Sequence, residues 1–290
     1  MKIKGTTKLV GVLGYPVRHS LSPVFQNAAF QHLKMDWVYV PCEVKPKDLK
    51  TAIEGLQALG FVGVNVTIPY KKEVIFFLNA LDSEARALGS VNTIKFEKSI
   101  RKGYSTDGVG FIRSLKEEGK FDPQGKTVFL IGAGGSAYAV AGTLIRAGIK
   151  KIFVCNRTWE KAVNLAEYLG KTFSFQEIEL VEFCRRHRKS IWENIDLLVN
   201  TTSVGLKGRE KTLVKPENMR PGLFVYDLIY HRWTRLLHTA QRLNLPHLNG
   251  ISMLIYQGAS SFEIWTGKRA PVEVMKNSLG QIPAFVEKRR

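Results

Sequence analysis

Short apolar runs alternate along the chain with stretches in which apolar residues recur at helical spacing. Buried parallel strands are continuous apolar runs, and the helices that connect them carry one apolar stripe. The alternation therefore predicts an α/β protein with mainly parallel sheets. In the first part of the chain we expect strands near residues 8–13, 37–40, 63–67, 91–96 and 101–104, and helices near residues 23–34, 47–59 and 82–88.

A second series of strands and helices begins near Lys126. The helical pattern at residues 108–118 ends in a polar stretch, residues 118–123, whose glycine and proline break the periodicity and mark a boundary. Beyond it we expect a Rossmann sheet with helices between its strands. Its strands are predicted near residues 128–131, 151–155, 197–200 and 223–227, and a last amphipathic helix near residues 252–266.

The apolar run at residues 128–131 leads directly into a glycine-rich turn, G-x-G-x-x-A, at residues 132–137, and a helical pattern follows. Such a turn lets backbone N–H groups approach a pyrophosphate at the positive end of the next helix. The motif predicts a dinucleotide site. Because it begins in mid-chain, more than a hundred residues before it are left for another role, and substrate binding is the obvious candidate.

The residues after the next predicted strand indicate which dinucleotide binds. NAD-binding units have an acidic residue there, whereas this chain has Asn156, Arg157 and Thr158, with Lys161 one turn further on. A guanidinium offers paired donors to a 2′-phosphate, which a carboxylate would repel. NADP is therefore favoured over NAD. In the alternative interpretation Thr158 only caps the following helix and Arg157 is solvated, and the two interpretations are compatible.

Two charged residues stand just past predicted strand ends, where parallel sheets bind ligands. Lys71 follows the apolar alternation and proline of residues 65–70, and Asp107 lies in the sequence Ser-Thr-Asp-Gly at residues 105–108. A cation and a carboxylate brought together can transfer a proton. Each residue taken singly is more often a solvated surface charge.

Composition excludes several classes of protein. The chain has 290 residues and is 44% hydrophobic. It has no apolar stretch long enough to span a membrane and none that forms a signal-peptide core. We therefore expect a globular, cytoplasmic protein that does not associate with a membrane. Three cysteines without C-x-x-C spacing predict neither a disulfide nor a metal site, and Cys155 lies in an apolar run that predicts burial.

The formal net charge of +18 raises the possibility of nucleic-acid binding. Basic residues are nevertheless scattered from Lys2 to Arg290, and no helix-turn-helix, zinc or RNA-recognition motif accompanies them. The densest run, residues 185–189, is interpreted as a solvated helix end. We therefore expect no nucleic-acid partner. The positive charge is expected instead to steer small anions, such as a phosphorylated dinucleotide and a carboxylate substrate, toward the protein.

Taken together and in order, the motifs resemble the shikimate dehydrogenase family over nearly the whole chain. The resemblance implies NADP-dependent reduction of 3-dehydroshikimate to shikimate, on the route to chorismate and aromatic amino acids. It rests on Ser20-Leu21-Ser22-Pro23, the N-V-T-x-P-x-K pattern of residues 65–71, Val91-Asn92-Thr93, Thr106-Asp107-Gly108, the glycine turn, Asn156-Arg157-Thr158, Asn200-Thr201-Thr202 and the segment from Gly250 to Gln257.

Carried over residue by residue, the resemblance assigns the catalytic chemistry to Lys71, as proton donor to the forming alkoxide, and to Asp107, which orients the lysine and the substrate. It implies that Ser20 and Ser22 hold the substrate carboxylate. In a local alternative Ser22 caps a helix whose first residue is Pro23. The other implied substrate-binding residues are Asn65, Thr67, Asn92, Tyr230 and Gln257.

The resemblance also implies the cofactor contacts. Met253 taken alone would be a core residue, and Gln257 lies one turn beyond it, so the last helix is expected to return to the first domain. Two positions depart from the family pattern: the loop after Tyr230 lacks a proline, and Tyr138 replaces a frequent arginine. The assigned residues are Gly132, Ala133, Gly134, Gly135 and Ser136 at the pyrophosphate, Asn156, Arg157, Thr158 and Lys161 at the 2′-phosphate, and Thr201, Leu228, Gly250 and Met253.

The expected organisation is a substrate-binding domain at residues 1–108, a Rossmann NADP-binding domain at 109–248 and C-terminal helices at 249–290 that pack back on the substrate domain. A monomer or homodimer is expected. Two rival functions remain: a dehydrogenase that also takes quinate, often with NAD, and a regulatory protein that keeps the fold and senses ligands. The shikimate-type S-x-S segment argues against the first rival, and the retained Lys71 and Asp107 argue against the second.

Overall fold

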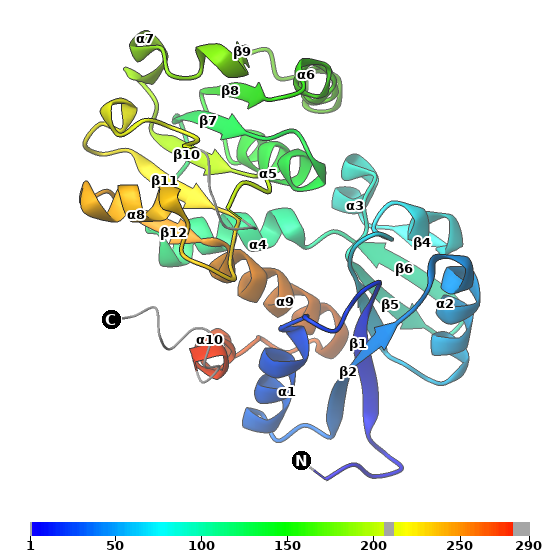
Figure 1. Ribbon diagram of the computed structural model, residues 1–290. Coiled ribbons are helices and arrows are strands. Elements are labelled where there is room, and N and C mark those ends of the chain that lie inside the picture. The colour runs from blue at the N-terminus through cyan, green and yellow to red at the C-terminus, as the bar shows by residue number, and fades with distance from the viewer. Residues whose placement is uncertain (1, 206–211, 281–290) are drawn as a thin grey trace. The chain divides into compact units, whose positions relative to one another are not determined.

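The computed structural model describes residues 2–205 and 212–280, and it divides into two compact units (Figure 1). The first unit consists of the residues up to Gly110 together with those from Ile255 onward. The second unit runs from Phe111 to Leu254. Each unit has its own six-stranded sheet among the described residues, as the two series of apolar runs predict.

The sheet of the first unit is mixed, in the order β2-β1-β3-β5-β6-β4. Strands β1, β2 and β3 are parallel, as expected, but β5 is antiparallel to both β3 and β6. The link between β5 and β6 is too short for a parallel crossover, so these strands form a hairpin. The strands are β1 Lys8–Gly14, β2 Trp37–Glu43, β3 Gly63–Val66, β4 Ala80–Leu81, β5 Thr93–Glu97 and β6 Ile100–Tyr104.

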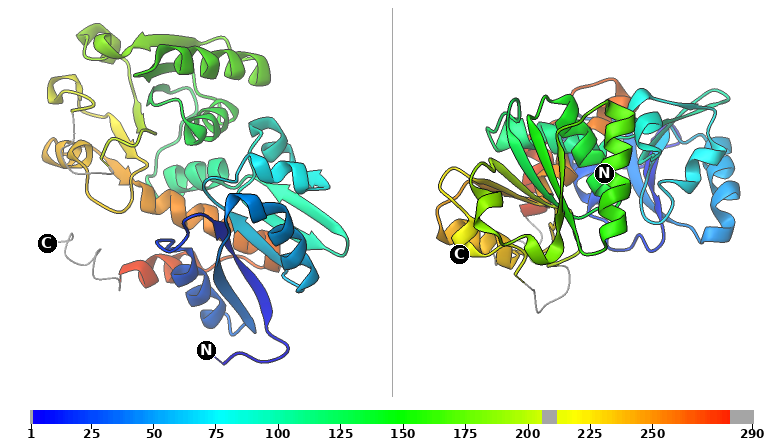
Figure 2. Two further views of the ribbon diagram at one scale, coloured as in Figure 1. Left: turned by 45° about the vertical axis from the view of Figure 1, so that its right-hand side comes forward. Right: turned by 90° about the horizontal axis from the view of Figure 1, so that it is seen from above.

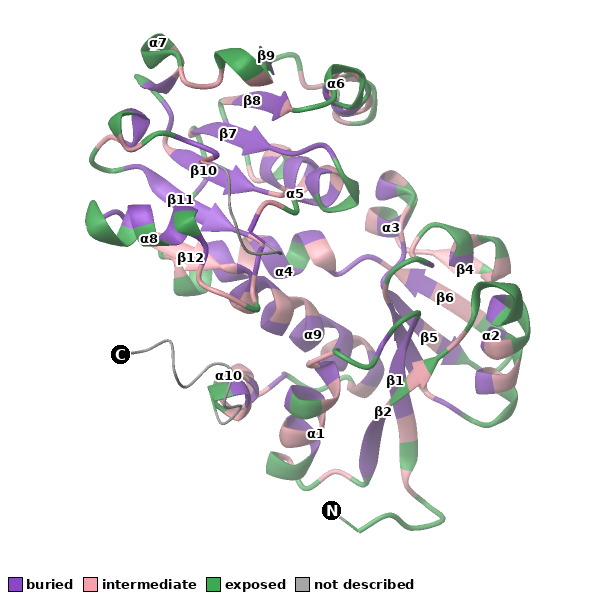
Figure 3. Cartoon of the chain, viewed as in Figure 1, coloured by how far each residue is buried: buried purple, intermediate pink, exposed green. Residues whose placement is uncertain are grey.

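Helices surround this sheet, and the C-terminal segment returns to it as predicted. Helix α1 (Ser22–His32) packs against α10 (Val272–Gly280). Phe30 of α1 stacks on Phe262 of α9 (Gly250–Thr266), with ring centroids 5.1 Å apart. Figure 3 shows the buried face of α9 in purple. The remaining helical elements are η1 Pro46–Asp48, α2 Leu49–Ala58, η2 Glu73–Phe77, α3 Ser83–Leu88 and α4 Asp107–Arg113.

Gly63 is required where α9 crosses the sheet. A Cβ atom at this position would collide with the Ile94 carbonyl and with Nε1 of Trp265, which donates to that carbonyl at 3.0 Å. We expect Gly63→Ala to lower the free energy of unfolding by about 1–3 kcal/mol or more, because the strand and the indole must move apart. Gly55→Ala is the control, since its Cβ would have nothing within 4 Å. Equal melting temperatures for the two variants would contradict this packing.

The second unit contains a parallel sheet in the order β12-β11-β10-β7-β8-β9. Strand β7 is central and the chain proceeds outward first on one side and then on the other, which is the doubly wound Rossmann order. Sequence analysis missed the two edge strands. The strands are β7 Thr127–Ile131, β8 Lys151–Asn156, β9 Ile178–Glu182, β10 Leu197–Asn200, β11 Phe224–Asp227 and β12 His247–Asn249.

Helices cover both faces of this sheet (Figure 2). Val128 and Leu130 of β7 point to the face packed by α5 and α6, while Phe129 and Ile131 point to the face packed by α7 and α8. This alternation follows from the two-residue period of a strand. The helical elements are a π-helical turn Ser114–Glu118, α5 Gly135–Arg146, α6 Trp159–Phe173, η4 Phe183–Arg185, α7 Lys189–Trp192, η5 Pro216–Asn218 and α8 Arg235–Arg242.

The interpretation of residues 185–189 as a solvated helix end describes the exposed Arg185, Arg188 and Lys189, but not Arg186. Arg186 lies between η4 and α7 and has a structural role. Its guanidinium donates to the carbonyls of Phe183, Thr212 and Leu213 and lies 3.8 Å from the centroid of the Phe183 ring. Burial lowers the pKa of this group. The basic run therefore includes a cation that holds two loops together, which sequence charge alone does not reveal.

Candidate active site

The lysine and aspartate singled out in the sequence are in direct contact in the first unit. Nζ of Lys71 lies 2.6 Å from Oδ2 of Asp107, and the two side chains are 31% and 16% exposed. Lys71 follows strand β3, and Asp107 is the first residue of α4. The backbone near Lys71 is fixed by the amide of Val91, which donates to the Lys71 carbonyl at 2.7 Å. The pair is half-buried and remains accessible to a small ligand.

Asn92 lies at the centre of this group. Its Nδ2 donates to Oδ1 of Asp107 at 2.9 Å and to Oε1 of Gln257 at 3.3 Å. Its Oδ1 accepts from the backbone amide of Thr106 at 2.8 Å. Asn92 precedes strand β5, so the segment before β5, the start of α4 and the middle of α9 meet here. Four of the predicted residues, Lys71, Asn92, Asp107 and Gln257, are thereby brought together.

The other predicted substrate-binding residues of the first unit lie on β3 or directly after it, and at or just before the start of α1. Asn65 is buried, and Thr67 is half-buried with its methyl group against Gly14. Oγ of Ser20 accepts from the amide of Ser22 at 3.3 Å. The alternative in which Ser22 caps α1 is wrong, because the N-cap is Leu21 and Ser22 is the first helical residue.

The arrangement can transfer a proton. An ammonium held by a carboxylate is a fixed donor toward an oxygen on which negative charge develops. The carboxylate accepts hydrogen bonds from both Lys71 and Asn92, so its two oxygens are held in one orientation. Orientation of a donor by a second group is the arrangement that general acid catalysis requires.

The glycine-rich turn of the second unit has the backbone geometry of a dinucleotide site. Gly132 has a φ of 113°, and a Cβ there would collide with Oγ1 of Thr201. Thr201 in turn donates to the Ile131 carbonyl at 2.9 Å. Helix α5 begins at Gly135, and no side chain among the described residues caps it. Its first N–H groups can therefore bind a pyrophosphate, with Gly134 and Ser136 exposed beside them.

The residues assigned to the 2′-phosphate lie together at the start of α6. Nδ2 of Asn156 donates to the Thr158 carbonyl at 2.8 Å, while Arg157 and Lys161 are exposed. Thr158 occupies the N-cap position but its side chain makes no capping hydrogen bond, so capping does not occupy its hydroxyl. The cluster has two cations and a hydroxyl, which suits a phosphate dianion.

Tyr138, which departs from the family pattern, packs against α6. Its ring centroid lies 4.9 Å from that of Tyr168, so the tyrosine fills the space between α5 and α6 with an aromatic pair. The other departure is the loop after Tyr230, which lacks the proline; Tyr230 itself is half-buried beside His231, and burial raises the pKa of its phenol. The tyrosine at position 138 therefore has a packing role in this chain.

The loop after β11 carries Leu228 and is held by a buried carboxylate that sequence reasoning missed. Asp227 is fully buried and accepts from Nδ2 of Asn200 at 2.9 Å and from Oγ1 of Thr234 at 2.7 Å. A Cβ at Gly250 would collide with the Leu228 carbonyl. In the sequence, Asp227 could have been found because it is a carboxylate at the end of an apolar run. Met253 packs in the core next to this loop, as its apolar character predicts.

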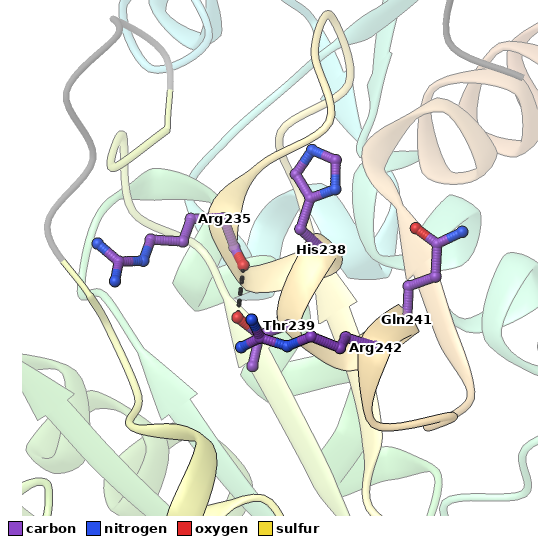
Figure 4. A pocket seen from close by; sticks show the side chains of 5 residues that line it. All are labelled: Arg235, His238, Thr239, Gln241 and Arg242. Atoms are coloured by element: carbon purple, nitrogen blue, oxygen red, sulfur yellow. Dashed lines mark hydrogen bonds between the residues drawn. The ribbon is translucent and has the colours of Figure 1, made fainter. Parts of the chain in front are cut away.

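A shallow pocket on α8 lies outside the predicted residues. It is lined by residues of this one helix, and Oγ1 of Thr239 donates to the Arg235 carbonyl at 2.8 Å (Figure 4). His238 and Arg242 project from neighbouring turns. In the described part of the chain no group of three metal-ligating side chains occurs, and no helix there is long and apolar enough to cross a membrane.

The cysteines differ in exposure, and the burial of Cys155 is confirmed. Burial raises the pKa of its thiol to about 12, whereas Cys184 is exposed. We expect a thiol-specific disulfide reagent to modify Cys184 rapidly and Cys155 only after unfolding, because the thiolate is the reactive form. Cys42 is half-buried and burial raises the pKa of its thiol as well, so Cys184→Ser should abolish the fast phase. A fast phase that persists in this variant would contradict the assigned environments.

A lysine–aspartate pair beyond the strand ends of one unit and a glycine turn at the start of a helix in a Rossmann unit define a two-domain, dinucleotide-dependent dehydrogenase. The sequence matches the family models "Shikimate dehydrogenase substrate binding domain" at residues 12–94, "Shikimate / quinate 5-dehydrogenase" at 115–204 and "Shikimate 5'-dehydrogenase C-terminal domain" at 250–279. The chain belongs to the shikimate dehydrogenase family.

Individual relatives are similar over almost their full length. Shikimate dehydrogenase (NADP(+)) of Moorella thermoacetica is 45% identical over 281 residues, covering 96% of this chain and 95% of that protein. A crystal structure of a shikimate dehydrogenase in complex with NADP+ has a TM-score of 0.89 and 39% identity, covering 99% and 97%. Shikimate 5-dehydrogenase from Listeria monocytogenes, in complex with shikimate and NAD, has a TM-score of 0.89 and 36% identity, covering 96% and 98%.

Proposed function

We propose that this protein catalyses the reversible, NADP-dependent reduction of 3-dehydroshikimate to shikimate, a step toward chorismate and the aromatic amino acids. The observation that carries the proposal is the 2.6 Å contact between Lys71 and Asp107 at the end of the substrate-domain sheet. The full-length similarity to NADP-dependent shikimate dehydrogenases supports it. We also propose a cytoplasmic monomer or homodimer, as expected from the sequence.

In the proposed reaction Lys71 is the proton donor. NADPH, when bound, supplies the hydride that reduces the substrate carbonyl. Lys71, as an ammonium, gives a proton to the resulting alkoxide, and in the reverse direction its neutral form accepts the proton. Asp107 holds the ammonium and orients the substrate hydroxyl. The ring hydroxyls are assigned to Asn65, Thr67, Asn92 and Gln257, with Tyr230 an additional contact, and the carboxylate to the hydroxyls of Ser20 and Ser22.

Cofactor binding is assigned to the second unit. The backbone of Gly132, Ala133, Gly134, Gly135 and Ser136 would hold the pyrophosphate, and Asn156, Arg157, Thr158 and Lys161 the 2′-phosphate. The exposed side of α6 and the uncapped start of α5 support this assignment. Thr201, Leu228, Gly250 and Met253 complete the assigned cofactor contacts.

Product analysis tests the proposal. Incubation with 3-dehydroshikimate and NADPH should yield shikimate in an amount equal to the NADPH consumed, measured by chromatography and by loss of absorbance at the reduced-nicotinamide band. A protein that only senses ligands would bind the compounds and consume no NADPH. That outcome would replace the enzymatic proposal with the regulatory one.

A further inference from the structure

A cluster of buried polar side chains surrounds Asn65 in the first unit. Besides Asn65 it contains Tyr39 on β2, Thr93 on β5 and Ser261 on α9, none of which is more than 6% exposed. Buried polar groups need hydrogen-bond partners, and a fully satisfied network holds each member in one orientation. The cluster adjoins the candidate active site, because Thr93 follows Asn92 in the chain.

The amide of Asn65 is fixed in orientation. Its Nδ2 faces three acceptors: the carbonyl of Asn92 at 3.0 Å, Oγ1 of Thr93 at 3.0 Å and Oγ of Ser261 at 2.9 Å. A backbone carbonyl can only accept, so the nitrogen end of the amide must face it. At the other end, Oδ1 accepts from the phenol of Tyr39 at 2.8 Å. Reversing the amide would place Oδ1 against the Asn92 carbonyl, two acceptors that cannot bond to each other.

Tyr39 donates to Asn65 from the neighbouring part of the sheet. The side chain of Ser22, assigned to the substrate carboxylate, is near enough to lower the pKa of the Tyr39 phenol. Burial raises the pKa of Tyr39 well above its ordinary value, against the smaller opposing effect of Ser22, so the phenol remains protonated and can donate at neutral pH.

Ser261 connects Asn65 to α9. Its hydroxyl lies 3.1 Å from the carbonyl of Gln257, one helical turn earlier, and 2.8 Å from Oγ1 of Thr93. Gln257 contacts Asn92, which in turn contacts Asp107. Ser261 therefore contacts both Asn65 and the backbone of Gln257, two residues assigned to the ring hydroxyls.

We propose that Tyr39 and Ser261 are positioning residues for substrate binding, which hold the Asn65 amide in the orientation that receives a ring hydroxyl. The proposal rests on the proposed function. An amide that is fixed before binding loses no rotational freedom when the ligand arrives, so its hydrogen bond contributes more to affinity. Neither residue needs to touch the substrate.

Steady-state kinetics of two variants tests the proposal. Tyr39→Phe and Ser261→Ala should each raise the KM for shikimate about three- to tenfold, the effect of one net hydrogen bond, while the KM for NADP changes less than about twofold. A role in folding alone would lower the melting temperature and leave the two KM values unchanged in the molecules that remain folded. Unchanged KM for shikimate in both folded variants would overturn the proposal.

Ser260→Ala is the matched control for Ser261→Ala. Ser260 is also buried on α9, and its hydroxyl bonds to the carbonyl of Tyr256 at 3.1 Å, the same type of bond that Ser261 makes. Its replacement removes one hydroxyl that bonds within α9, from the same part of the helix, so the kinetics should be those of the parent protein. An equal rise in the shikimate KM for both serine variants would contradict the assignment to Ser261.

A double-mutant cycle separates positioning from a direct role. If Tyr39 acts through Asn65, Tyr39→Phe should leave the shikimate KM of Asn65→Ala unchanged. A further three- to tenfold rise in that background would show that Tyr39 acts by another route. If Tyr39→Phe fails to fold, the cycle is performed with Ser261→Ala, which removes fewer atoms. A parent protein that does not oxidise shikimate would instead refute the proposed function, a distinct outcome.

Discussion

Lys71→Ala should lower kcat for shikimate oxidation by about a hundred- to ten-thousandfold, the range that a positioned proton-transfer group contributes. Without the ammonium, no group at this position neutralises the alkoxide, and Asp107 is left beside the reacting oxygen as an uncompensated negative charge. The fold should persist, because Lys71 is partly exposed and lies outside the two cores. Stopped-flow or steady-state absorbance measures the rate, and circular dichroism checks the fold.

Lys72→Ala is the control for this prediction. The neighbouring lysine is exposed, and its removal makes the same change in composition and net charge. Its kinetics should match those of the parent protein. If Lys71→Ala retained near-normal turnover, the lysine would have no part in the mechanism, and a loss of turnover of equal size in both variants would indicate a field effect of positive charge on ligand binding.

Arg157→Ala should raise the KM for NADP about ten- to a hundredfold, while kcat and the KM for NAD change little. A charge-assisted hydrogen bond to the 2′-phosphate contributes about 1.5–3 kcal/mol, and NAD lacks this phosphate. Arg157 is exposed after β8 at the start of α6, so the substitution leaves the core intact. Initial rates at varied NADP and NAD, with saturating shikimate, give the four constants.

Arg242→Ala is the matched control, since it removes an exposed arginine from α8 of the same unit. It should change neither cofactor constant. Equal losses of NADP and NAD affinity in Arg157→Ala would mean that the guanidinium binds a part shared by both cofactors, such as the adenine or pyrophosphate. The preference for NADP would then have to come from Thr158 and Lys161.

Strong local patterns made much of the fold predictable. The continuous apolar run of β7 and the glycine turn after it together specify a strand, a turn and a helix start, and the structure has all three. Edge strands were missed because only one residue of β9 is buried, and its glutamates interrupt the apolar run. The antiparallel hairpin of β5 and β6 was also missed, since apolar runs do not report strand direction.

In the candidate site, too, some residues could be predicted from local sequence and others could not. Lys71 and Asp107 were identifiable because each follows a strand end within a dense motif. Tyr39 and Ser261 were not, because they lie 26 and 196 residues from Asn65 in sequence and belong to segments that look like ordinary core. Their connection depends on the packing of α9 against the sheet, which no local pattern encodes. Asp227 was missed although it stands at the end of an apolar strand, because its partners Asn200 and Thr234 come from other segments.

The most direct test of the central claim is kcat/KM for shikimate and for quinate, each with NADP and with NAD, followed at the reduced-nicotinamide band. The account predicts that the pair of shikimate and NADP exceeds the other three pairs by at least about tenfold, because both the substrate motifs and Arg157 favour it. Comparable values with quinate or NAD would show a dual-specificity dehydrogenase. Turnover with none of the four pairs would contradict the assignment of this protein as an enzyme of shikimate formation.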